Sequence, residues 1–214
     1  MPKEPYDQSE LFRSQQFSKL KIDHFYVLLG TLDEYMGGYA NPADRIDYYY
    51  GSETDVVDLV YKICSIIISE FDLEQDCELI KSEKGSFVQS DSIKRKLNAF
   101  FDSRLDDFLV HKRYASTNYE EMSDEQEWSY LLGVYIRSYD GIQFRFANAK
   151  SKVKRTHQIL CNCSTWDDDE ITMKSYFATP HVTVISLNQE HRALKELKKC
   201  KEKLEKLPLT PHKK

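Results

Sequence analysis

Arg104 and His111 are the residues of this chain whose types and spacing best suit chemistry. On a helical wheel that starts at Ile93, one stripe collects the apolar residues Leu97, Phe100, Phe101 and Phe108. Arg104 falls at about 20° and His111 at about 0°, in the middle of that stripe, with Asp107 near its edge at about −40°. Histidine titrates near neutrality, and a guanidinium group matches the oxygens of a phosphate. Because an unpaired charge on a buried stripe is costly, we expect this pair to have a structural or chemical task.

The segment that carries the pair, Arg104-Leu-Asp-Asp-Phe-Leu-Val-His111, resembles the Arg–(four to six residues)–His motif of the HEPN superfamily. Members of that superfamily are helical-bundle domains, and many are metal-independent ribonucleases of defence and toxin systems. The resemblance implies that His111 is a general acid or base and that Arg104 stabilises charge on an RNA phosphate. It also implies attack by the RNA 2′-hydroxyl and a homodimer in which two motifs meet. It covers roughly twenty residues, and Leu105 stands where the family often has a polar residue.

The same pair also has a structural interpretation, which the weakness of so short a motif favours. Arg104 would form an ion pair with Asp107 or with a glutamate inside a helical bundle. His111 would lie near a helix C-terminus, where a protonated ring interacts favourably with the helix dipole. This interpretation requires no substrate, and it leaves the chain without a catalytic motif.

Three further patterns resemble parts of known sites. His181-Val-Thr183 matches half of a two-histidine phosphoesterase signature, and no second His-x-Thr or His-x-Ser is present. On a predicted strand, His157, Cys161 and Cys163 share parity and project to one side. A zinc site there would need a fourth ligand, from Cys64, Cys77, Cys200 or an acidic residue; the alternative is two half-buried thiols. The acidic run at 167–170 lacks the glycine and the alternating spacing of a calcium loop.

The chain has no glycine-rich phosphate loop, no dinucleotide fingerprint and no Gly-x-Ser-x-Gly. A nucleotide-dependent enzyme of the common folds is therefore not expected, and no cofactor is predicted; no metal site is assigned, and metal binding by His157, Cys161 and Cys163 stays an open alternative.

Helices are predicted first along the chain and strands later. Apolar spacing and capping residues favour helices over residues 9–30, 52–73, 90–114 and 123–132, although the second half of 9–30 also fits a buried strand. Residues 32–51, rich in tyrosine and glycine, are predicted to form an ordered loop. The Asp140-Gly141 step predicts a hairpin between strands 134–138 and 142–146. Further strands are predicted at 156–163, 171–177 and 181–187, followed by an amphipathic helix over 189–207. No internal repeat is apparent.

This order predicts an α+β fold with a helical N-terminal part, a small antiparallel sheet and a C-terminal amphipathic helix. We expect a mainly helical acidic part at 1–132, a sheet with the basic helix at 133–207 packed on it as one unit, and a disordered tail at 208–214. From Lys150 onward the chain holds 14 Lys and Arg against 8 Asp and Glu, a net of about +6. The other residues carry about −11. The basic part either follows phosphates, docks on the acidic part of the same chain or forms a solvated helix face.

The composition is that of a globular protein, with 41% apolar residues among 214. The apolar run Ile63–Ile68 is far short of a membrane span, and five cysteines without small-secreted spacing favour reduced thiols in the cytoplasm. Two functions are therefore compatible with the sequence. One is a HEPN-like ribonuclease acting on RNA; the other is a non-catalytic interaction or regulatory protein whose acidic surface meets a basic protein partner.

Overall fold

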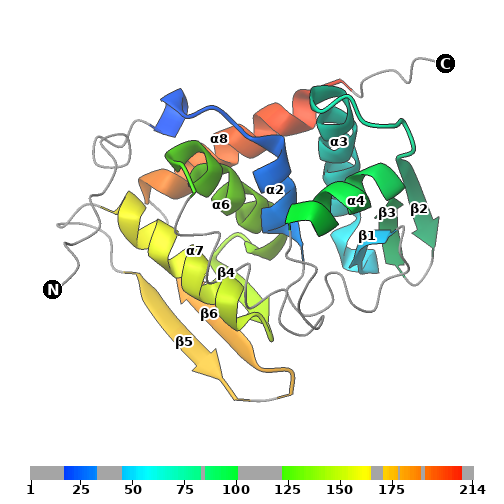
Figure 1. Cartoon of the computed structure of the whole chain (residues 1–214). Coiled ribbons are helices and arrows are strands. Elements are labelled where there is room, and N and C mark those ends of the chain that lie inside the picture. The colour runs from blue at the N-terminus through cyan, green and yellow to red at the C-terminus, as the bar shows by residue number, and fades with distance from the viewer. Residues whose placement is uncertain are drawn as a thin grey trace, which may run out of the picture.

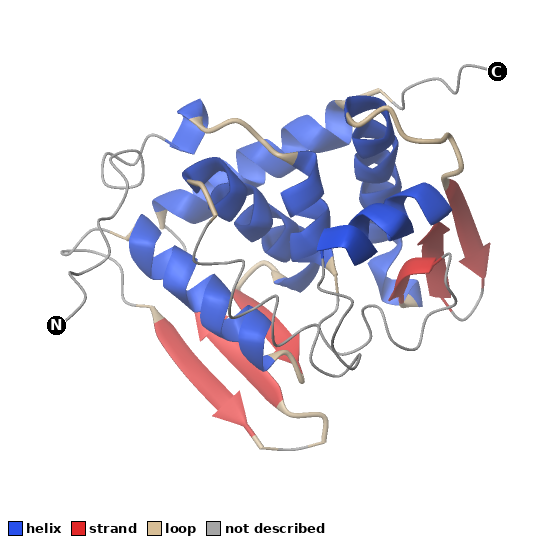
Figure 2. Cartoon of the chain, viewed as in Figure 1, coloured by secondary structure: helices blue, strands red, loops and turns tan. Residues whose placement is uncertain are grey.

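The computed structural model describes residues 17–32, 45–82, 85–100, 122–164, 171–177, 179–188 and 191–208. Helices and short strands alternate through them (Figures 1 and 2), which confirms the predicted α+β class. The elements are, in order, η1 (Phe17–Lys19), α2 (His24–Thr31), β1 (Arg45–Tyr49), η2 (Gly51–Glu53), α3 (Thr54–Glu70), β2 (Glu78–Ser82), β3 (Gly85–Gln89), α4 (Asp91–Phe100), α6 (Asp124–Ser138), β4 (Gln143–Ala147), α7 (Lys150–Cys163), β5 (Thr172–Tyr176), β6 (Val182–Ser186) and α8 (Arg192–Lys206).

One topology occurs twice along the chain. The order helix, strand, helix, strand, strand, helix runs from α2 to α4 and again from α6 to α8. Both sheets are antiparallel, with the strand orders β1-β3-β2 and β4-β6-β5, so the last strand of each copy lies in the middle. The interpretation that no internal repeat exists is therefore wrong, because the duplication lies in the order and pairing of the elements.

The two copies meet where α2 packs against α6, between the two sheets (Figure 1). A Cβ atom on Gly30 would lie 2.1 Å from the Tyr130 carbonyl oxygen, and one on Gly133 would lie 2.0 Å from the Val27 carbonyl oxygen. Each glycine thus faces the backbone of the other helix, at the residue three positions before that helix's own glycine. Only a residue without a side chain permits this close approach of two helices.

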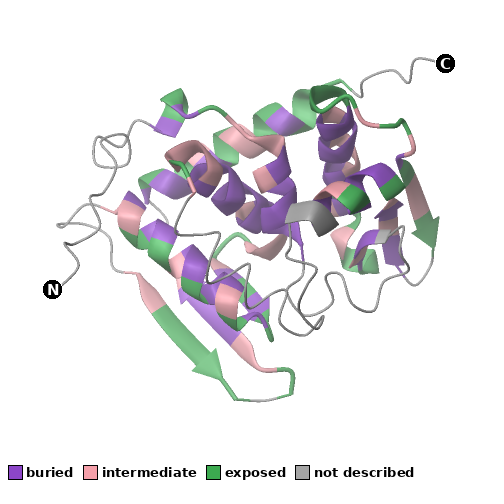
Figure 3. Ribbon diagram, in the orientation of Figure 1, coloured by how far each residue is buried: buried purple, intermediate pink, exposed green. Residues whose placement is uncertain are grey.

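Helices cover one face of each sheet. α3 packs against all three strands of the first sheet and α4 against β1, while α6 packs against β4 and α7 against β6. The residues that face these helices are fully buried, among them Tyr49, Val88, Phe144 and Ile185. Figure 3 shows the buried residues gathered on the central helices, whereas most of β5 is exposed. A buried ion pair between Arg155 and Glu127 joins α7 to α6.

Two predicted strands are helices in the structure. Residues 134–138 continue α6, because the capping box of Ser123 and Gln126 starts a helix that is buried on most sides up to Ile136. A helix buried all round shows no clear period, so its alternating residues imitate a strand. Residues 156–163 belong to α7, whose buried residues Thr156, Ile159, Leu160 and Cys163 follow helical spacing. The strands expected at 142–146, 171–177 and 181–187 are confirmed as β4, β5 and β6, and the helices expected at 52–73 and 189–207 as α3 and α8.

The first sheet was not predicted at all. β1 lies within the expected loop 32–51, and it buries Ile46, Asp47 and Tyr49 together, so it lacks the alternation of a half-buried strand. A β-bulge between Arg45 and Asp47 explains why two adjacent residues are both buried. The division of the chain at residue 132 stays a prediction, and residues 209–214 lie outside the described residues.

Candidate functional site

The predicted pair Arg104 and His111 lies outside the described residues. The start of its stripe is seen on α4, where Ile93 and Leu97 are buried as the helical wheel requires. The role of the pair as a site stays a prediction, and the candidate site is built from other residues.

A cleft of about 170 Å³ opens at the C-terminal end of α6, between the two sheets. Residues from both copies of the topology line it: Tyr50, Glu53, Arg137, Ser138, Arg145, Phe146, Ala147, Ala149 and Lys152. Three of these are basic and one is acidic, so the lining carries a positive formal charge. Arg137 and Lys152 are held by contacts within the fold, so exposed Arg145 is the lining cation that an anionic ligand can reach.

Arg137 organises this cleft from the last turn of α6. Its guanidinium group donates to Asp47 Oδ2 at 2.6 Å and to Glu53 Oε1 at 3.0 Å, and it lies 4.6 Å from the centre of the Tyr49 ring. It also donates to the Tyr48 carbonyl oxygen at 3.0 Å. The Arg137 side chain is only 8% exposed and that of Asp47 only 1%. This buried ion pair fixes the first sheet to the second copy's central helix.

Two cations from the second copy hold the end of α2. The Arg137 Nη1 group donates to the Thr31 carbonyl oxygen at 2.8 Å, and Lys152 Nζ donates to the Leu32 carbonyl oxygen, also at 2.8 Å. Carbonyl groups in the last turn of a helix have no intrahelical partner and carry partial negative charge. Positive side chains supply the missing hydrogen-bond donors and balance the partial negative charge, so this part of the cleft is a rigid, charge-balanced frame.

The outer face of the second sheet continues from the cleft. The register places Arg145, Val184 and Lys174 side by side on β4, β6 and β5, on the face opposite Phe144 and Ile185. Arg145 and Lys174 are exposed, whereas Val184 is buried between them and lies outside the main core cluster. Long basic side chains can cover an apolar neighbour with their stems while their charged ends stay in water. This face presents two cations together with Gln143, Thr172, Tyr176 and Ser186.

The outer face of the first sheet has a different character. Tyr48 stands there, and its ring meets the Tyr50 ring edge to face at 5.5 Å. Gly85 on β3 permits this, because an added Cβ would lie 2.4 Å from the Tyr48 hydroxyl oxygen. Phe87 and Ile80 are half-buried on the same face. The first sheet therefore offers aromatic and apolar contacts, and the second offers charge.

The other predicted sites are not assembled. His157 and Cys161 lie on one face of helix α7, with Sγ 3.7 Å from Nδ1, while Cys163 is buried elsewhere on that helix. The strand parity that grouped the three residues does not exist, because α7 is a helix. Within the described ranges no three His, Cys, Asp or Glu residues are grouped so that they could hold a metal. His181 stacks on Phe177 at 5.0 Å in place of facing a second His motif. No described helix is long and apolar enough to span a bilayer.

Comparisons with known proteins place the fold. No protein-family model matches the sequence, and no curated protein does. The structure is similar to that of I-DmoI in complex with DNA and Ca, with a TM-score of 0.54 and 13% identity over 88% of this chain and 93% of that chain. It is also similar to mesophilic variants of the homing endonuclease I-DmoI, with a TM-score of 0.54 and 14% identity over 79% and 90% of the two chains. The complex of I-DmoI with DNA and Mn gives 0.51 and 14% over 87% and 98%. At these identities the similarity is one of fold.

The HEPN resemblance is therefore wrong, since the similar structures are homing endonucleases and the chain carries two sheets around its central helices. The predictions of a ribonuclease function and of an RNA partner rested on that resemblance and are wrong too. The alternative, an acidic interaction protein with a basic partner, is corrected by the same finding, because the solved neighbours are in complex with DNA. The expected homodimer loses its basis, since both copies of the topology lie in one chain.

Sequence reasoning missed the helix pair and the cleft that it positions. The one feature that marks the pair is the tripeptide Leu-Leu-Gly, which occurs at residues 28–30 and again at 131–133. Both glycines stand at the helix crossing. The role of Arg137 was not predicted, because residues 134–138 were expected to form a strand. Only the helix that they form places Arg137 beside the end of α2.

Proposed function

We propose that this protein binds duplex DNA across the outer faces of its two sheets, with the cleft beside Arg137 at the centre of the contact. The observation that supports this most is the similarity of the fold, over 88% and 87% of this chain, to two I-DmoI structures solved in complex with DNA. Two sheets on either side of a basic cleft offer an extended surface of the kind that strand-based DNA readers use.

Charge supports the same assignment locally. The whole chain carries a formal net charge of −5, so binding of a polyanion requires a segregated basic surface. Arg145 and Lys174 supply it on the second sheet, where both residues are exposed. Tyr50 is 59% exposed beside the cleft and supplies a flat surface between the charged groups and the first sheet.

Fluorescence anisotropy with a labelled duplex tests the proposal. Each phosphate contact that is lost should weaken binding and reduce the slope of log K against log salt by about 0.9. We expect Arg145→Gln and Lys174→Gln each to show both effects. Lys203→Gln, on exposed α8 and with the same change in charge, is the matched control and should leave binding unchanged. No duplex binding at low salt, or equal loss in all three variants, would contradict the proposal.

Cleavage of that DNA is the second candidate function. One I-DmoI structure of this fold holds target DNA nicked in one strand in the presence of Mn, which favours it. The described carboxylates of the cleft do not fit a metal, because Arg137 holds both Asp47 and Glu53. We therefore assign no metal-dependent step to them. Nicking of a supercoiled plasmid with Mg²⁺ or Mn²⁺, compared with EDTA, tests the activity; binding without nicking would remove cleavage and leave DNA binding.

A cytoplasmic location is part of the proposal. All five cysteines are free, and thiols stay reduced in that compartment.

A further inference from the structure

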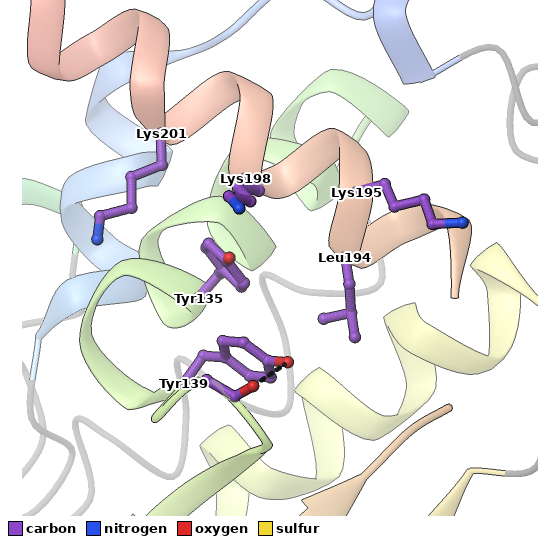
Figure 4. Close-up of a pocket in the computed structure, with 7 residues that line it drawn as sticks. Tyr135, Tyr139, Leu194, Lys195, Lys198 and Lys201 are labelled. Carbon is purple, nitrogen blue, oxygen red and sulfur yellow. Dashed lines mark hydrogen bonds between the residues drawn. The ribbon is translucent and has the colours of Figure 1, made fainter. Parts of the chain in front are cut away.

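A second cavity lies on another surface, in the groove between α6 and α8. Its volume is about 460 Å³, and its lining includes Tyr135, Tyr139, Leu194, Lys195, Lys198 and Lys201 (Figure 4). It shares no lining residue with the cleft beside Arg137. The volume is in the range of cavities that hold small ligands, and it is much larger than a phosphate ion needs.

One wall of the groove is aromatic and preformed. The rings of Tyr135 and Tyr139 stack with centres 4.8 Å apart and planes 22° apart. Both rings also contact Phe144, which is fully buried, and the Tyr139 hydroxyl donates to the Gly141 carbonyl oxygen at 3.1 Å. Because the two rings are fixed from behind, the groove presents a rigid apolar surface, to which Leu194 adds from α8 (Figure 4). Such a surface suits a planar ring.

The opposite wall is cationic. Lys195, Lys198 and Lys201 stand three residues apart and line the α8 side of the groove. Lys201 pairs with Glu205 at 3.5 Å, whereas Lys195 and Lys198 form no ion pair within the described ranges. Glu202 and Glu205 are the acidic groups near Tyr135. Burial, with Tyr139 and these two carboxylates, raises the pKa of Tyr135, so its hydroxyl stays protonated and is available as a donor. Ammonium and phenol donors together suit phosphate oxygens.

We propose that the groove between α6 and α8 binds a nucleoside phosphate, with the base against Tyr135, Tyr139 and Leu194 and the phosphates on Lys198. A bare phosphate would leave the apolar wall and most of the volume unused. An uncharged ring would make no use of Lys198. A ligand that carries both groups uses the two walls at once.

Isothermal titration calorimetry on the full chain tests this, with ADP as the probe and adenosine and pyrophosphate as its two separated halves. We expect ADP to bind more tightly than either half. Lys198→Gln should weaken ADP binding about tenfold, the value of one charge-assisted hydrogen bond at a partly exposed site. Tyr135→Phe, which removes only the hydroxyl, should weaken it severalfold. Lys203→Gln on the same helix is the matched control and should leave the affinity unchanged.

Four results would overturn the inference. These are the absence of ADP binding at millimolar concentration, pyrophosphate binding as tight as that of ADP, an equal loss in Lys198→Gln and Lys203→Gln, and displacement of ADP by a single-stranded oligonucleotide. The last result would assign the groove to DNA. Duplex binding by Lys174→Gln gives a separate readout, so failure here is distinguishable from failure of the proposed function.

Discussion

Replacing Gly133 by alanine tests whether the crossing of α2 and α6 positions the site. In an ordinary helix this change stabilises by about 1 kcal/mol, because alanine has the higher helix propensity. Here the added Cβ would lie 2.0 Å from the Val27 carbonyl oxygen and 2.8 Å from the Gly30 Cα. Optimal carbon–carbon contacts are about 3.5–4.0 Å, so the helices would have to separate by roughly an ångström.

That separation determines the size of the effect. The obstructing atoms are backbone atoms and cannot rotate away, so the cost should reach the upper end of overpacking, about 3 kcal/mol. Set against the gain in propensity, the net loss is about 2 kcal/mol, or a melting temperature lower by roughly 4–8 °C for a chain of this length. Urea denaturation followed by circular dichroism measures it.

Two comparisons make this test specific. Gly51→Ala is the matched control, since its Cβ would meet nothing within 4 Å, and its stability should change by less than about 1 kcal/mol. Gly30→Ala with Gly133→Ala should cost less than the sum of the single changes, because both act on one contact. If Gly133→Ala is as stable as the parent chain, the packing argument is refuted.

Three further predictions concern Arg137, Asp76 and the cysteines. Arg137→Met leaves Asp47 buried without its counter-charge and should cost about 3–5 kcal/mol of unfolding free energy, of which adding Asp47→Asn should restore a part; a loss below 1 kcal/mol would speak against the ion pair. Burial raises the pKa of Asp76, but hydrogen bonds from the Ser90 and Ser92 hydroxyls and the Ser92 N–H together lower it below its usual 3.8. A carboxyl group whose pKa is lower in the folded state stabilises the fold at pH values above its unfolded-state pKa, and this contribution is lost as the pH falls through its folded-state pKa. Asp76→Asn should therefore make the free energy of unfolding depend less on pH in the acid range. An unchanged pH dependence would contradict this. Burial raises the pKa of Cys64, Cys161 and Cys163 alike, so accessibility decides their reactivity. Iodoacetamide should modify exposed Cys161 in the native protein and reach buried Cys64 and Cys163 only after unfolding, as mass spectrometry can show; early labelling of Cys64 would refute its burial.

Local residue patterns predicted the elements whose signals lie within one segment. The capping box at Ser123 and the stripe of Leu194, Leu197 and Leu204 on α8 depend on neighbours within a few turns, and both are present. The alternation in β4 was also visible, because one face of that strand is buried and the other exposed. Where an element is buried on most sides, as in the second half of α6, the sequence carries no period, and the prediction of a strand failed.

The amino-acid sequence by itself determined the α+β class, the basic C-terminal helix and three of the strands, since these depend on local spacing and charge. Only the tertiary structure decided that the topology is duplicated, that Gly30 and Gly133 meet, and that Arg137 joins the end of α2 to Asp47 and Glu53. Those contacts link residues about 85 to 105 positions apart, and no pattern within a helix or a strand encodes which distant backbone it will approach. The cleft exists because α2 and α6 carry glycines at their crossing and can approach closely. This approach brings the C-terminal ends of both helices to one place.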